Sequence, residues 1–141
     1  MLMKAEPAHC LIVSCGVLAI FTGLVYIANL PGLTSDATGT TIRWGWLVLL
    51  GGMLALWLAV SSNQGRRSRG VVVGLLMCLG FIFLLQLPPI VAWFAFHGQV
   101  ISDGPVGPMG HWAWSLLHIV LAAASAGALY LLFFRTRCWT G

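Results

Sequence analysis

The stretch GVVVGLLMCLGFIFLLQLPPIVAWFAF, residues 70–96, contains no Lys, Arg, Asp or Glu. A helix rises about 1.5 Å per residue, so about 20 apolar residues cross the hydrocarbon core of a bilayer, which is roughly 30 Å thick. This stretch exceeds that length, and it therefore predicts a transmembrane helix.

Three further stretches without charged residues lie at 10–30, 44–62 and 112–134. The segments between them are short, so we expect one domain, residues 1–141, with four transmembrane helices. The composition agrees, because 60% of the residues are hydrophobic and 7% are charged, whereas soluble domains carry about 25% charged residues. The predicted fold class is an all-α integral membrane protein. A soluble nucleic-acid-binding protein, which the net charge of +4 would otherwise suggest, is excluded.

The basic residues predict the orientation of these helices. Lys4, the cluster at 66–69 and the pair Arg135 and Arg137 fall on one side, and Arg43 alone falls on the other. Lys and Arg are held in the cytoplasm during insertion. We therefore expect a bacterial inner-membrane protein with both termini in the cytoplasm and with residues 31–43 and 97–111 outside. Five tryptophans are predicted at the outer boundary, as a membrane-anchoring belt or as a box that stacks on a ligand: Trp44, Trp46, Trp93, Trp112 and Trp114.

The two external loops share a pattern that indicates a tandem duplication of a two-helix hairpin. Residues 35–46 read SDATGTTIRWGW and residues 102–114 read SDGPVGPMGHWAW, and upstream Asn29-Leu30-Pro31 matches Gln86-Leu87-Pro88. Because two spans separate the copies, a duplication predicts a pseudo-twofold axis along the membrane normal. A chance match between apolar sequences is the alternative.

Pro88 and Pro89 lie inside the third stretch. A proline inside a helix lacks the N–H that bonds the carbonyl four residues earlier, so the carbonyls of Leu84 and Leu85 lose their partners. Either the helix continues through a kink, or it ends at the prolines and residues 90–96 lie along the membrane surface. The length of the stretch favours the kinked, continuous helix.

His118 is the candidate cofactor ligand. His111, Ser115 and His118 follow one another at steps of three or four residues, so they share one helix face. A neutral imidazole at His118, with Ser115 beside it, would suit a haem iron or a chlorophyll magnesium, and the Gln86 amide would suit a quinone. The alternative is a histidine hydrogen-bonded to a serine, to Gln86 or to a carbonyl freed by the prolines. His97 and His111 are candidate ligands of a shared metal, or else ordinary interfacial histidines.

Small residues four positions apart let helix backbones approach closely in a membrane. Such residues are predicted to mediate helix packing at six positions: Gly51, Ala55, Gly70, Gly74, Ala123 and Gly127. Ala123 and Gly127 lie off the face that carries His118, so we expect them to contact a helix or cofactor outside this chain. Three arginines are expected to bind anionic lipid headgroups, or alternatively a protein: Arg66, Arg67 and Arg69.

No motif of an enzyme occurs in the chain. The four predicted spans contain no Asp, Glu, Lys or Arg, which proton pumps and ion-coupled transporters use, and the four cysteines form no CxxC pair. The sequence therefore favours a non-catalytic, accessory integral membrane subunit that stabilises a larger electron-transport complex. Its expected partners are other membrane subunits and bound lipid, and no nucleic acid. The alternative is a haem-, chlorophyll- or quinone-binding membrane anchor that uses His118.

Overall fold

The computed structural model describes residues 7–29, 39–61, 68–95 and 108–137. Its four helices are α1 (Pro7–Ala28), α2 (Gly39–Ser61), α3 (Arg69–Ala95) and α4 (Pro108–Arg137). All four are long and apolar enough to cross a membrane. The prediction of an all-α fold with four such helices is confirmed.

The ends of the helices have recognisable local causes. Proline is the first residue of α1 and of α4, where its missing N–H has no helical acceptor to lose. Ser68 caps α3, because its side-chain oxygen accepts a hydrogen bond from the backbone N–H of Val71 at 3.4 Å. Asn29 directly follows α1 in the left-handed region, with φ 48°, and its backbone N–H bonds the Tyr26 carbonyl at 3.3 Å.

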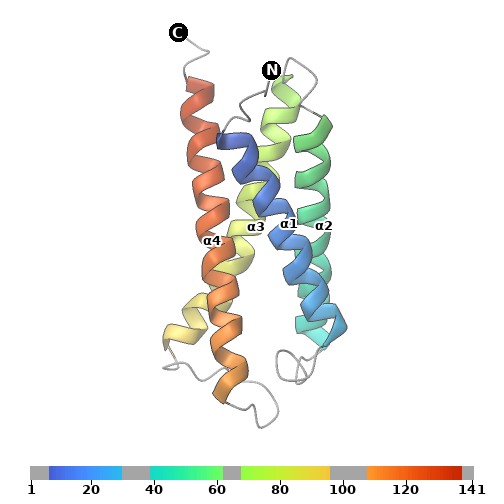
Figure 1. Cartoon of the computed structure of the whole chain (residues 1–141), viewed down its shortest axis with the longest axis vertical. Helices are drawn as coiled ribbons and strands as arrows, with labels where there is room; N and C mark the ends of the chain where they lie inside the picture. Colours follow the sequence, from blue (N-terminus) through green and yellow to red (C-terminus); the bar gives the residue numbers. More distant parts are fainter. Residues whose placement is uncertain (1–6, 30–38, 62–67, 96–107, 138–141) are drawn as a thin grey trace, which may run out of the picture.

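The helices alternate in direction and form a ring. Figure 1 shows α1 and α3 running one way and α2 and α4 the other, so that α1 begins and α4 ends at the same end of the bundle. Each helix packs against its two neighbours in the ring: α1 against α2 and α4, and α3 against α2 and α4. Helices α1 and α3 therefore lie diagonally across the bundle.

The backbones of α1 and α2 touch at two pairs of glycines. A Cβ atom on Gly23 would lie 2.7 Å from the carbonyl oxygen of Gly45, and one on Gly52 would lie 2.8 Å from that of Gly16. Such distances are too short for any side chain, so glycine is required at these contacts.

Four of the six predicted packing residues lie at contacts between helices or in the core. A Cβ on Gly51 would lie 3.3 Å from Ile82 of α3, and one on Gly74 would lie 3.2 Å from Leu58 of α2. Ala55 is fully buried. Gly127 packs on α1, because a Cβ there would lie 3.2 Å from Leu11; this residue therefore faces into the bundle and not towards a partner outside it.

The other two predicted packing residues, Gly70 and Ala123, are exposed. The only side chain that a Cβ on Gly70 would meet within 4 Å, among the described residues, is that of Ser68. Ala123 is exposed on the outer face of α4.

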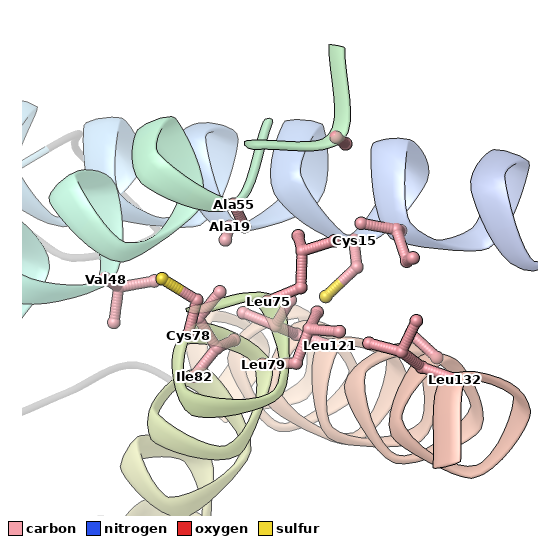
Figure 2. Packing of buried hydrophobic residues seen from close by; sticks show 13 residues of the cluster. Cys15, Ala19, Val48, Ala55, Leu75, Cys78, Leu79, Ile82, Leu121 and Leu132 are labelled. Atoms are coloured by element: carbon pink, nitrogen blue, oxygen red, sulfur yellow. The ribbon is translucent and has the colours of Figure 1, made fainter. Parts of the chain in front are cut away.

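The interior and the exterior of the bundle are both apolar. Side chains from all four helices converge in a buried cluster (Figure 2). Large apolar side chains also point outward: Trp57 is 64% exposed and Met77 is 71% exposed. A helix that is hydrophobic all round is typical of a membrane span or of the core of a large protein.

Helix α3 continues through Pro88 and Pro89, as the favoured alternative predicted, and it bends near its C-terminal end (Figure 1). The two matching tripeptides upstream of the loops, which begin at Asn29 and Gln86, differ in the local structure of their first residue. Asn29 follows the end of α1 with a positive φ, whereas Gln86 is fully buried within α3.

Candidate functional site

Four side chains, one from each helix, meet where α3 begins to bend. They are Tyr26 of α1, Trp44 of α2, Gln86 of α3 and His118 of α4, and we call them the four-helix cluster. The ring centroids of Tyr26 and Trp44 are 4.5 Å apart, and the Trp44 ring lies 5.1 Å from that of His118. Trp44 is half-buried, and Tyr26, Gln86 and His118 are 1%, 0% and 2% exposed.

The polar atoms of the cluster form a chain of hydrogen bonds with one direction. Gln86 Nε2 donates to the Ile82 carbonyl at 3.1 Å, which fixes the amide orientation because a carbonyl only accepts. Gln86 Oε1 therefore accepts from His118 Nδ1 at 2.6 Å. The other ring nitrogen of a neutral imidazole is an acceptor, so the Tyr26 hydroxyl donates to His118 Nε2. The His118–Gln86 hydrogen bond, which was one of the alternatives, is present in the structure.

Trp44 bonds the carbonyl that Pro89 leaves without a helical partner. In a regular helix the N–H of residue 89 would bond the Leu85 carbonyl, but Pro89 has no N–H. Trp44 Nε1 donates to this carbonyl oxygen at 3.1 Å. The indole thus supplies from α2 the hydrogen bond that α3 cannot make.

Other buried hydroxyls bond within their own helices. Thr22 donates to the Leu18 carbonyl at 2.7 Å. Ser125, which lies on the same helix face as His118, donates to the carbonyls of Leu121 at 2.8 Å and Ala122 at 3.0 Å. The hydrogen bonds of Tyr26, Trp44 and Gln86 described above, by contrast, join different helices.

Several predicted site residues lie outside the part of the chain that the structure describes. His97, Arg66 and Arg67 are among them, as are the side chains of Ser115 and His111. Arg69 is exposed at the start of α3. Among the described residues, no group of three or more His, Cys, Asp or Glu side chains is placed to hold a metal ion. The proposed His97–His111 metal pair stays a prediction.

Sequence reasoning missed Tyr26 and assigned Trp44 to a boundary belt. The half-buried Trp44 ring packs against Tyr26 and His118, whereas Trp46 is exposed. A signal for Trp44 was present, because the carbonyl of Leu85 was expected to need a donor. The choice between donors depends on how α2 is turned towards α3, which the sequence of either helix does not reveal.

The cluster is chemically suited to joining helices. Both ring nitrogens of His118 and both polar atoms of the Gln86 amide are in hydrogen bonds to protein groups. A metal or haem iron could bind His118 Nε2 only after displacing the Tyr26 hydroxyl.

The chain matches no model of a known protein family, no curated protein and no solved structure.

Proposed function

We propose that the chain is a four-span integral protein of a bacterial inner membrane, with both termini in the cytoplasm. In this proposal it is a non-catalytic subunit that packs against and stabilises a larger membrane complex, with an electron-transport complex as the expected kind. Tandem duplication of a two-helix hairpin belongs to the same proposal, since the ring of alternating helices suits a twofold axis along the bundle.

One observation carries the proposal: the polar side chains of Tyr26, Gln86 and His118 are hydrogen-bonded inside the bundle, while many large apolar side chains point outward. One internal chain of hydrogen bonds contains the side chains of Tyr26, Gln86 and His118. Large apolar residues are exposed on each helix, for example Phe21, Trp57, Met77 and Tyr130. Such an exterior suits lipid and neighbouring membrane helices, and such an interior suits a structural role.

The outer face of α4 is the proposed contact with a partner helix. Ala123 is exposed there, and in lipid a bulky apolar residue would cost nothing at this position. A small residue permits a second helix to approach closely. Gly127 does not belong to this contact, because it packs on Leu11 of α1.

Retention of variants in the native complex tests this contact. We expect Ala123→Leu to insert normally but to be largely lost from the complex when membranes are solubilised mildly and separated by native electrophoresis. Ser14→Leu is the matched control, because Ser14 is exposed on α1 and away from α4's outer face. Equal retention of the two variants, or a chain that migrates alone in every mild detergent, would contradict the proposal.

The second candidate function is a haem-, chlorophyll- or quinone-binding anchor that uses His118. Its support is a buried imidazole shared by all four helices. It ranks second because the Tyr26 hydroxyl already bonds Nε2, and the Gln86 amide already donates to the Ile82 carbonyl and accepts from His118. An optical spectrum of the purified complex separates the two functions. A pigment band that disappears in His118→Ala would establish the anchor, and identical spectra would favour the structural subunit.

A further inference from the structure

At the bend of α3 a backbone carbonyl lacks its helical donor, which is more unfavourable in a membrane than in water. A backbone carbonyl without a donor is strongly unfavourable in lipid, because no water is present to bond it. Pro89 removes the donor of Leu85, and Leu85 is half-buried against the core. The structure solves this with a donor from another helix, Trp44 Nε1 at 3.1 Å.

We propose that Trp44 is the latch of a hinge in α3. Its bond to the Leu85 carbonyl lies directly before Pro88 and Pro89, so it fixes the direction in which residues 90–95 leave the bundle. Releasing the bond frees the peptide unit that follows Leu85, and with it the final segment, to change its angle, while residues 69–84 stay packed. Trp44 is therefore a positioning residue for the end of α3.

The latch is coupled to the rest of the four-helix cluster. The Trp44 ring is in contact with the rings of Tyr26 and His118, and His118 bonds Gln86, three residues before Pro89. The indole cannot leave Leu85 without repacking these rings. In the closed state of the hinge, the Trp44–Leu85 bond is therefore formed together with the contacts of the four-helix cluster. This inference does not depend on whether the chain is a subunit of a larger complex.

A double-mutant cycle between Trp44 and Pro89 tests the latch. Trp44→Phe keeps an aromatic ring and removes the donor. Pro89→Ala restores a backbone N–H that can bond the Leu85 carbonyl. The readout is amide hydrogen exchange of residues 90–95 in the full chain reconstituted in lipid nanodiscs. It reports opening of this segment.

Trp44→Phe is expected to accelerate this exchange roughly three- to tenfold, the range that corresponds to one interhelical hydrogen bond. In the Pro89→Ala background the same substitution is expected to change exchange by less than about twofold, because residue 89 then supplies the donor. Trp46→Phe is the matched control, because Trp46 is exposed on the same helix, and it should leave exchange unchanged. Equal acceleration by Trp44→Phe in both backgrounds would overturn the latch and leave Trp44 as a packing residue.

A second variant separates the hydrogen bond from the volume of the ring. Replacing Trp44 by its benzothienyl isostere, in which sulfur takes the place of the indole N–H, preserves ring size and so avoids a cavity. The latch predicts the same acceleration for this isostere as for Trp44→Phe. Wild-type exchange in the isostere would also overturn it.

Discussion

The hydroxyl of Tyr26, near the end of α1, donates a hydrogen bond to Nε2 of His118 in α4, 92 positions later in the chain. This bond joins the first helix to the last and closes the ring of helices at the level of the α3 bend. The tautomer of His118 is determined by Gln86, because Nδ1 donates to Gln86 Oε1 and leaves Nε2 as the acceptor for the Tyr26 hydroxyl. If the proton of His118 were on Nε2 instead, the bare Nδ1 atom would face the Gln86 oxygen, and two acceptors would oppose each other.

Removing the Tyr26 hydroxyl should destabilise the bundle without unfolding it. Tyr26→Phe leaves His118 Nε2 without its donor, and interhelical hydrogen bonds in membrane proteins contribute about 0.6 kcal/mol on average and up to about 1.7 kcal/mol. We expect a loss near the upper value, because Tyr26 is buried. The free energy of unfolding in mixed micelles measures it. Tyr130→Phe is the control, since Tyr130 is exposed; a loss as large in the control would show that the Tyr26–His118 bond contributes nothing specific.

Gln86→Leu should act through the same chain of bonds. It leaves His118 Nδ1 without its acceptor, so the imidazole is no longer held towards Tyr26, and we expect a loss of about 1–3 kcal/mol in the free energy of unfolding. The double variant Tyr26→Phe/Gln86→Leu should lose less than the sum of the single losses, because both act on one ring. Strict additivity in the same unfolding measurement would mean that the two bonds are independent.

The sequence was sufficient for the helices and for part of the cluster. Helix positions follow from the length of apolar stretches without charges, and the continuation of α3 through Pro88 and Pro89 follows from the length of its stretch. The pairing of His118 with Gln86 was one of the alternatives open, because two polar groups inside a bundle of apolar helices have few other partners.

The sequence was insufficient wherever the answer depends on how one helix is turned towards another. Each helix is apolar on every face, so periodicity does not identify its inner side. Gly127 was therefore expected to face outward, and Trp44 was assigned to the boundary. The opposed glycines of α1 and α2, such as Gly23 and Gly45, depend on the register of two antiparallel helices. That register is a property of the pair.

The orientation in the membrane is testable by labelling in intact cells. In a chain without its native cysteines, single cysteines at Thr38 and Val106 should react with a membrane-impermeant thiol reagent from outside. A cysteine at Ser68, which precedes α3 beside the basic cluster, should react only after the cells are opened. The reason is the retention of Arg and Lys in the cytoplasm during insertion. Labelling of the Ser68 cysteine in intact cells would reverse the proposed orientation.

The contact between α1 and α2 should be the part of the bundle least tolerant of added volume. In Gly23→Ala the new Cβ would lie 2.7 Å from the Gly45 carbonyl oxygen and 2.7 Å from Leu49 Cβ, so the two helices must separate. Overpacking of this kind costs about 1–3 kcal/mol. Gly80→Ala is the matched control, because a Cβ on Gly80 meets nothing within 4 Å among the described residues. Replacing this helical glycine by alanine should be neutral or should stabilise the bundle by up to about 1 kcal/mol. The free energies of unfolding of the two variants in mixed micelles should therefore change in opposite directions, or only Gly23→Ala should change. If Gly23→Ala were as stable as the wild type, α1 and α2 would not be in backbone contact at this position.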